Sequence, residues 1–408
     1  MNAPLRLPDA VQPADRPVGY FVHHQGRGHA ERCAAVVNAL PATRPVTIFC
    51  ARDDIFPPLR PGVEIRLIPS LFEATGQEAA CDFTAQPDTL HCAPLGWPGI
   101  RTAMGTMAQW FMTANPALMI CDVSAEVAQL ARICSVPHVK VLQHGQRTDP
   151  GHRAAYDGAA GLLVPSDASL AQDDWDDAMR ARTCFAGGLG VDLTLPDRAA
   201  ARVRLGLDPD REVVLVLSGG GGTGFPSAPI AVGARAMPDS LWLTVGKIAR
   251  DWHATEPANL RHDGWVDGAA DHIAAADCIV ASTGNTTCQQ ILGAARPWVA
   301  VPEWRYFDEQ VEKARVLHRA GLAHAVPGLP SSVQAWRAAI AAARAGHDPV
   351  RQRACVSADA AAKTATWLEA LIARLWPQTD PIVTSEQTHA RAPAPAASQE
   401  HHHATPIA

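Results

Sequence analysis

The densest group of polar residues follows a short apolar run in the second half of the chain. Asp277 to Ala281 is expected to form a buried strand, and a helical stretch reaching about Gly293 follows it. Between the two stand small polar residues and one glycine: Ser282, Thr283, Gly284, Asn285, Thr286 and Thr287. Free N–H groups and hydroxyls at a helix start form an anion site without any charged side chain. The alternative is ordinary N-capping of the helix by Thr283, Asn285 or Thr286.

A run of glycines follows another apolar strand, expected at Val213 to Leu217. The run and its neighbour are Gly219, Gly220, Gly221, Gly222 and Thr223. Glycines at a strand end let backbone N–H groups approach a phosphate closely. The spacing is not that of a Walker NTPase loop, because no lysine follows the run. The alternative is a flexible loop between a strand and a helix.

An acidic residue and an amide stand after a third strand, expected at Trp298 to Val301. They are Glu309 and Gln310, and they lead into a helix from Val311. Strand ends in open α/β sheets face the ligand crevice. Both side chains can therefore reach a ligand that carries many hydroxyl groups.

A candidate proton acceptor stands near the start of the chain. The apolar run Val18 to Val22 predicts a buried strand, and a turn containing Gly26 and Gly28 follows it. His29 comes next and opens a helical pattern. Because imidazole can take a proton from a hydroxyl near neutral pH, His29 is a candidate general base.

Other ionisable residues also stand at strand ends in the first half. Asp122 follows the strand Leu118 to Cys121, where it can orient the histidine, take the proton itself or cap the next helix. His144 is a third candidate, after the strand Val139 to Leu142. His23 and His24 are expected to be satisfied core or turn residues.

The elements that must position these groups alternate between strands and helices. This alternation predicts parallel sheets with helices on both faces. The opening unit of strand, glycine turn and helix occurs twice, which indicates two Rossmann-like domains facing across a cleft. We expect a flexible N-terminus over residues 1–17, domains over 18–190 and 191–355, a C-terminal helix over 356–377 that packs back across the domains, and a disordered tail over 378–408.

The stretch from Gly264 to Val326 resembles the C-terminal domain of GT-B glycosyltransferases. The closest likeness is to the family of the bacterial peptidoglycan N-acetylglucosaminyltransferase and the plant galactolipid synthases. In that family a G-x-x-T-x-x-E helix start binds diphosphate and ribose, and the matching residues here are Gly284, Thr287 and Gln290. Gln290 replaces the family's glutamate, so it can still accept and donate hydrogen bonds but without charge-assisted strength.

Other family positions match as well. An acidic-Gln pair that holds the donor sugar in the family corresponds to Glu309 and Gln310, and Val266 falls in the segment that clasps the base. Gln25 to His29 resembles the family's first G-x-G-H loop, which faces donor and acceptor across the cleft. The resemblance implies that the loops with Gly26 and Gly28, and Gly220 to Thr223, contact the donor together with Asn285 and Thr286.

The resemblance implies inverting transfer of a sugar from a UDP-sugar, or another nucleotide-sugar, to an acceptor hydroxyl. His29 or Asp122 would deprotonate the acceptor, and the helix start would hold the diphosphate without a metal ion. No cofactor is expected. The alternatives are a nucleotide-sugar 2-epimerase of the same architecture and a non-catalytic nucleotide-sugar-binding subunit.

Composition narrows the partners of the chain. The formal net charge of −6 over 408 residues argues against a nucleic-acid binder. The ten cysteines include no CxxC pair, and no leader-like apolar stretch stands at the start. A cytoplasmic protein, with at most peripheral contact at the inner face of a membrane, is therefore expected. The acceptor is either lipid-linked or a small molecule.

A long loop from about Leu71 to Arg101 carries several aromatic side chains. Together with Trp110 and Phe111 it is interpreted as acceptor-side surface, because long structured loops at a ligand edge are often functional. Aromatic packing beneath the loop is the alternative.

Overall fold

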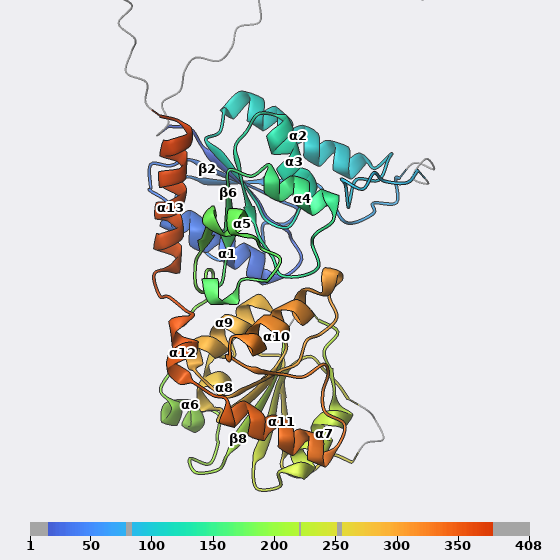
Figure 1. The fold of residues 1–408 in the computed structure, drawn as a ribbon, viewed down its shortest axis with the longest axis vertical. Coiled ribbons are helices and arrows are strands. Elements are labelled where there is room, and N and C mark those ends of the chain that lie inside the picture. Colours follow the sequence, from blue (N-terminus) through green and yellow to red (C-terminus); the bar gives the residue numbers. More distant parts are fainter. Residues whose placement is uncertain (1–14, 79–83, 220–221, 251–254, 378–408) are drawn as a thin grey trace, which may run out of the picture.

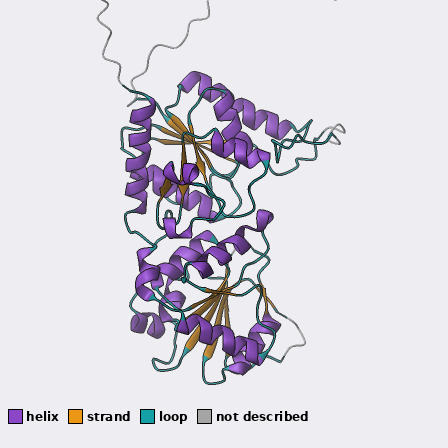
Figure 2. Ribbon diagram, in the orientation of Figure 1, coloured by secondary structure: helices purple, strands orange, loops and turns teal. Residues whose placement is uncertain are grey.

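The computed structural model describes residues 15–78, 84–219, 222–250 and 255–377. They form two α/β units stacked along the long axis of the molecule, each with a parallel sheet between helices (Figures 1 and 2). The expected disordered tail, and the expected flexible N-terminus up to residue 14, lie outside these residues. Within the described part, no helix combines the length and the hydrophobicity that crossing a bilayer requires.

The N-terminal sheet has seven parallel strands in the order β3-β2-β1-β4-β5-β6-β7. The strands are β1 (Val18–Phe21), β2 (Val46–Cys50), β3 (Val63–Leu67), β4 (Leu118–Cys121), β5 (His138–Val141), β6 (Gly161–Val164) and β7 (Thr183–Phe185). Its helices are α1 (Arg27–Ala39), α2 (Pro98–Ala114), α3 (Ala125–Ile133), α4 (Pro150–Asp157) and α5 (Asp177–Ala181). The strand order reverses between β1 and β4, which opens a crevice at their carboxyl ends.

The C-terminal sheet has six parallel strands in the order β12-β10-β8-β13-β14-β15. They are β8 (Val213–Ser218), β10 (Leu241–Gly246), β12 (Leu260–Gly264), β13 (Cys278–Ala281), β14 (Trp298–Ala300) and β15 (His324–Ala325). The helices are α6 (Arg198–Arg204), α7 (Ser227–Ala236), α8 (Ala270–Ala275), α9 (Asn285–Ala294), α10 (Glu309–Arg319), α11 (Val333–Ala345) and α12 (Pro349–Ala354). A separate two-stranded ladder joins β9 (Phe225–Pro226) to β11 (Ile248–Ala249). The reversal between β8 and β13 opens a second crevice.

The central strands are apolar along their whole length because both faces of each sheet are covered by helices. Every residue of β1, β4 and β13 is buried. Such strands appear in sequence as continuous Val/Ile/Leu-rich runs, which explains why they could be predicted. The expected alternation of strands and helices, and the two parallel sheets, are confirmed. The short strands β7, β12 and β15 carry weaker apolar runs and were not predicted.

The last helix, α13 (Ala360–Leu375), returns to the N-terminal unit (Figure 1). Leu368 and Ile372 are buried in the same apolar cluster as β1 and α1. A Cβ atom on Gly161 would lie 2.8 Å from the Trp367 ring, so β6 accepts this helix only because it begins with glycine. The chain therefore crosses between the units twice, after β7 and after α12. The two crossings lie side by side, because the Ser357 N–H donates to the Gly187 carbonyl over 2.7 Å.

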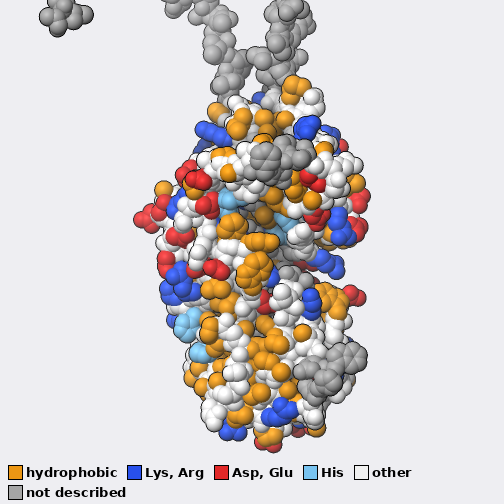
Figure 3. Space-filling view, turned by 90° about the vertical axis from the view of Figure 1, so that its right-hand side faces the viewer, with side chains coloured by type: hydrophobic (Ala, Val, Ile, Leu, Met, Phe, Trp, Pro, Cys, Tyr) orange, Lys and Arg blue, Asp and Glu red, His pale blue; other side chains and the backbone are white. Residues whose placement is uncertain are grey.

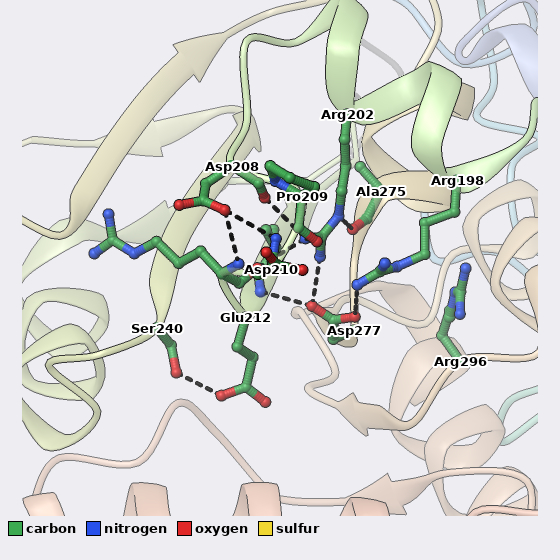
Figure 4. A network of polar contacts seen from close by, with 12 residues as sticks. Arg198, Arg202, Asp208, Pro209, Asp210, Glu212, Ser240, Ala275, Asp277 and Arg296 are labelled. Carbon is green, nitrogen blue, oxygen red and sulfur yellow. Dashed lines mark hydrogen bonds and ion pairs between the residues drawn. The ribbon is translucent and has the colours of Figure 1, made fainter.

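A polar network stabilises the C-terminal unit at the amino ends of β8 and β13 (Figure 4). The buried Arg202 of α6 donates to the carbonyl oxygens of Asp208, Pro209, Arg211 and Ala275. Its guanidinium also lies 2.6 Å from Asp277, whose carboxylate accepts from the Val213 N–H over 2.8 Å. The network ties α6 to the starts of β8 and β13, so Asp277 is structural.

Candidate functional site

The carboxyl ends of the two sheets face each other across a cleft between the units. Gly28 at the start of α1 stands against Thr286 at the start of α9: a Cβ atom on Gly28 would lie 3.1 Å from the Thr286 hydroxyl. On either side of this contact lies a cavity. We call them the donor-side cavity, of about 800 Å³, and the acceptor-side cavity, of about 830 Å³.

The donor-side cavity gathers most of the residues that were expected to hold a nucleotide-sugar. Its walls include Gly26, Gly28, Val266, Gly284, Thr286, Thr287, Gln290 and Gln310. The glycine run contributes Gly219 to this cavity, whereas Gly222 and Thr223 line the acceptor-side cavity. Gly220 and Gly221 lie outside the described residues. The roles of all these residues remain predictions.

The N-terminus of α9 has no side-chain cap. Gly284 occupies the N-cap position, and no side chain accepts a hydrogen bond there. Thr283 instead donates its hydroxyl to the Gln310 carbonyl over 2.8 Å, and the Asn285 side chain accepts from Lys313. The proposed capping by Thr283, Asn285 or Thr286 is therefore not found. The first-turn N–H groups and the helix dipole are left to favour an anion in the cavity.

Gln310 and Glu309 are adjacent in sequence but face different surroundings. The buried Gln310 side chain accepts from the Thr283 N–H at 3.2 Å and from the Glu303 N–H at 2.9 Å, so it fixes the loop before α9. Glu309 lines the acceptor-side cavity, and its carboxylate lies 3.4 Å from the Arg147 guanidinium of the N-terminal unit. Only Gln310 lines the donor-side cavity.

An acidic side chain lies beneath the glycine run. Glu303 is buried, and one of its carboxylate oxygens accepts from the Gly224 N–H over 2.9 Å. A Cβ atom on Gly222 would lie 2.3 Å from this carboxylate, so the close approach requires glycine at that position. The glycine run thus meets a carboxyl group on one side, which makes the start of α9 the better candidate for an anion site.

His29 and Asp122 meet at the opposite wall of the cleft. The His29 Nδ1 atom lies 3.1 Å from an Asp122 carboxylate oxygen, and the Arg32 guanidinium lies 2.6 Å from the same oxygen. Burial disfavours ionisation of Asp122, but Arg32 and His29 outweigh it and hold the pKa of this carboxyl below its usual range. An ionised Asp122 can accept a hydrogen bond from a proton-bearing Nδ1 atom of His29. The Nε2 atom of His29 then carries no proton and can act as a base.

The sequence did not reveal the residues that support this pair. Arg32 stands one helical turn after His29, and helical spacing was the only available signal. Lys140 of β5 donates to the Val123 carbonyl over 2.8 Å, and Val123 has a left-handed φ of 70°. Burial lowers the pKa of Lys140 to about 8 against the opposing charge of Asp122. Lys140 thus stabilises the strained turn that follows Asp122.

Two of the other histidines are structural. His144 is buried, its Nε2 atom lies 2.7 Å from the Leu170 carbonyl, and burial lowers its pKa well below the usual value. His24 pairs with Glu73 at 2.9 Å. His23, expected to be a core or turn residue, lines the acceptor-side cavity together with His29. Burial, His29 and His24 together lower the pKa of His23 to about 4.

The acceptor-side cavity is rich in aromatic and imidazole rings. Its lining includes Phe72, His91, His152, Trp304, Tyr306 and Phe307. Figure 3 looks onto the edge of the molecule that lies to the right in Figure 1, and hydrophobic side chains gather there where the two units meet. The expected acceptor-side surface is partly wrong: Trp110 and Phe111 are buried in the N-terminal core, where Trp110 packs edge-on against Phe49.

One aromatic residue in the donor-side cavity was not among the predicted site residues. Trp265 follows β12 and is 64% exposed although its ring lines the cavity. The available signal was its neighbour Val266, which was matched to the family segment that clasps the base.

Comparison with solved structures identifies the fold. A kitacinnamycin glycosyltransferase aligns with a TM-score of 0.61 at 18% identity, over 89% of this chain and 100% of its own. UGT2 of Phytolacca americana, solved with UDP-2-fluoro-glucose and pterostilbene, aligns at 0.59 and 10% identity, over 88% and 99%. MurG of Acinetobacter baumannii aligns at 0.53 and 12% identity, over 88% and 99%. No family model and no curated protein sequence matches the chain. The molecule has the GT-B fold of glycosyltransferases, as expected from the resemblance.

Proposed function

We propose that the chain is an inverting glycosyltransferase that moves a sugar from a UDP-sugar to the hydroxyl of an acceptor. One observation carries the proposal: His29, partly exposed to the acceptor-side cavity and paired with the buried Asp122, faces the uncapped N-terminus of α9 across the cleft. The first group can remove a proton, and the second can hold a departing diphosphate. The UGT2 structure, solved with UDP-2-fluoro-glucose, has the same fold, which supports a uridine nucleotide as donor.

In the proposed complex the donor would lie lengthwise in the donor-side cavity. Its diphosphate would lie at the first turn of α9, near Thr286 and Thr287, and its base would stack on the exposed ring of Trp265. Gln290 would hydrogen-bond to the ribose, and Gln310 would face the sugar. This places the anomeric carbon near the contact between Gly28 and Thr286, where the two cavities meet.

The reaction then needs one proton transfer and one displacement. The Nε2 atom of His29 takes the proton of the acceptor hydroxyl, and Asp122 stabilises the imidazolium that forms. The acceptor oxygen forms a bond to the anomeric carbon as the bond from that carbon to the diphosphate oxygen breaks. UDP leaves with its new negative charge facing the α9 N–H groups. Attack from the face opposite the diphosphate inverts the configuration.

The acceptor-side cavity indicates the kind of acceptor. Its volume of about 830 Å³ and its aromatic walls suit a small molecule with an apolar body and at least one hydroxyl group.

Two experiments test the proposed function. Thermal unfolding of the full chain with UDP, TDP and GDP sugars should show a rise in Tm with UDP-sugars, because a ligand that binds the folded state stabilises it. Mass spectrometry of mixtures with phenolic and alcoholic acceptors should then show a gain of one hexose residue that disappears in His29→Ala. Epimerised sugar nucleotide without any acceptor would instead support an epimerase, and no Tm shift with any nucleotide would contradict the donor site.

A further inference from the structure

Three potential metal ligands from two segments meet in the wall of the acceptor-side cavity. His91 comes from the loop before α2, Asp149 is the N-cap of α4, and His152 lies in the first turn of α4. The Nδ1 atom of His152 lies 2.6 Å from one Asp149 oxygen, and the Nε2 atom of His91 contacts the other. One ligand atom from each residue lies within 4.8 Å of the other two. Among the described residues, these are the His, Cys, Asp or Glu side chains that come together in a group of three with this geometry.

We propose that His91, Asp149 and His152 bind a divalent transition-metal ion, with Zn²⁺ the best match. Two imidazole nitrogens and one carboxylate form a ligand set that zinc prefers, whereas Mg²⁺ and Ca²⁺ prefer sites made of oxygen atoms. Three protein ligands leave at least one coordination position for water or another ligand. His91 and His152 line the cavity, so an ion there lies within reach of a molecule in it.

The surroundings hold the ligands in place before any ion binds. His152 is buried, and the edge of the Phe307 ring packs against it with 4.8 Å between ring centroids. His91 lies so close to the start of α4 that a Cβ atom on Gly151 would come within 2.5 Å of its ring. The two imidazole centroids are 4.2 Å apart. Lengthening the contacts between the two nitrogens and the Asp149 oxygens by about 1 Å would admit an ion at ordinary Zn–N and Zn–O distances.

A carboxylate stands behind one of the ligands. An oxygen of Glu126 lies 3.8 Å from the Nδ1 atom of His91, and the same oxygen accepts from the backbone N–H groups of His91 and Cys92. Metal-bound histidines usually donate their second N–H to a carboxylate or carbonyl. Glu126 can play this part for His91 once its Nε2 atom coordinates the ion.

Arg147 opposes metal binding at the other histidine. Its guanidinium donates to the His152 Nε2 atom over 3.0 Å, which places the ring proton on Nδ1, facing Asp149. Coordination through Nδ1 moves that proton to Nε2, so the contact with Arg147 must break. Arg147 keeps other partners, namely the His144 carbonyl at 3.0 Å and Glu309 at 3.4 Å. The ion and Arg147 therefore compete for one imidazole.

The test measures Zn²⁺ binding by titration calorimetry to the full chain after treatment with EDTA, in the absence of any nucleotide. His401, His402 and His403 lie outside the described residues and are replaced by alanine in every protein compared, because they offer an unrelated metal site. We expect one equivalent of Zn²⁺ to bind, and His91→Ala and His152→Ala to weaken this binding about tenfold or more. His324→Ala, in the C-terminal unit, is the matched control and should bind as the parent does.

Two further variants separate ligand loss from misfolding. Asp149→Asn keeps an oxygen for the helix cap but loses the charge, so its metal-free Tm should stay near that of the parent while Zn²⁺ binding weakens. Arg147→Met removes the competing donor and should bind Zn²⁺ more tightly. Co²⁺ in place of Zn²⁺ should give visible absorption bands without the near-ultraviolet charge transfer that thiolate ligands produce.

The outcomes are decisive without reference to glycosyl transfer. Zn²⁺ binding that is equal in the parent and in His91→Ala, or that is not tighter in Arg147→Met, would overturn the metal site. The proposed donor site would be unaffected, because it lies in the other cavity.

Discussion

Asp122 has two partners for one oxygen, and only one arrangement of protons satisfies both. Arg32 and the His29 Nδ1 atom each approach this oxygen, and they lie 2.8 Å from each other. The low pKa of Asp122 keeps the oxygen charged, so Arg32 and a proton-bearing Nδ1 both donate to it, and Arg32 can donate to Nδ1 only in the tautomer whose proton lies on Nε2. The Asp122 carboxylate therefore holds the Arg32 guanidinium and the His29 ring in one geometry.

Replacing this carboxylate should impair the chemical step without loosening the donor. In Asp122→Asn the amide cannot hold a proton-bearing Nδ1 as the carboxylate does, so we expect kcat to fall about 10²- to 10⁴-fold. KM for the UDP-sugar should change little, because the donor-side cavity is not lined by Asp122. Steady-state kinetics at saturating acceptor measure both values. Asp157→Asn, at an exposed carboxylate of the same unit, is the control, and an equal loss in both variants would contradict the role of Asp122.

Because His138 is buried, we expect the protein to lose stability in mild acid. Burial lowers the pKa of His138 to about 4, so the unfolded chain binds more protons than the folded chain between about pH 6.5 and pH 4. The contribution is complete above the unfolded pKa and is lost as the pH falls through this range. His138→Gln retains a donor for the Ala155 carbonyl but does not titrate. Between pH 7 and pH 5 the variant should lose about 2 kcal/mol less free energy of unfolding than the parent. Equal losses in urea titrations would refute this assignment.

At this scale, sequence reasoning reached the residues with the most recognisable contexts. His29 stands between glycines and a helix, and Asp122 directly follows a fully apolar strand, so both were identified. Their 3.1 Å contact joins residues 93 positions apart, which no local pattern encodes. Arg147 and Lys140 were missed for the same reason, because their importance comes only from packing between distant segments.

The elements that close the cleft meet at a strained loop before α10. Phe307 and Asp308 both have left-handed φ values, of 59° and 52°. The Phe307 carbonyl accepts from the Gln146 N–H over 2.7 Å, and the Phe307 ring packs beneath the Arg147 guanidinium at 4.7 Å. These contacts between the two units offset the energetic cost of the strained backbone.

Gly145 makes this contact possible, which gives a prediction for the loop. Its φ is 123°, and a Cβ atom there would lie 2.6 Å from the Phe307 carbonyl. Gly145→Ala should therefore push the loops apart, lower the free energy of unfolding by more than about 1 kcal/mol and raise KM for the acceptor. Gly105→Ala is the matched control: its position in α2 is open, so alanine should be neutral or stabilising there. Urea unfolding with acceptor kinetics distinguishes the two, and unchanged values in Gly145→Ala would exclude a closing role for the loop.

The predictable elements were those with strong periodic signals. The strands β4 and β13 were predicted correctly because short apolar runs bounded by turns leave little choice. The aromatic residues of α2 were assigned to the surface, although Trp110 and Phe111 occupy the helix face that covers the sheet. A tryptophan beside a long loop gives no indication in sequence of which way it points.

For the molecule as a whole, α13 makes the N-terminal unit depend on the end of the chain. Leu368 is fully buried in the N-terminal core, and Glu369 pairs with Arg44 at 2.6 Å. Leu368→Ala should lower the free energy of unfolding by about 2–5 kcal/mol because it opens a cavity between α13 and the sheet. Chemical denaturation followed by tryptophan fluorescence measures this loss. Thr366→Ala, on the exposed side of the same helix, should change stability by less than about 1 kcal/mol. Similar losses in both would contradict the packing role of α13.

The paired crossings between the units also determine how the molecule can open. Because the Ser357 N–H donates to the Gly187 carbonyl, the two crossing segments lie together along one edge of the molecule. A rotation of the two units about this edge would leave the hydrogen bond between Ser357 and Gly187 in place. A few degrees of such rotation would widen the gap between the two units least at this edge and most at the far margin, where Phe307 contacts Gln146. The hydrogen bond from the Gln146 N–H to the Phe307 carbonyl is therefore the contact that an opening of the cleft by this rotation would strain most.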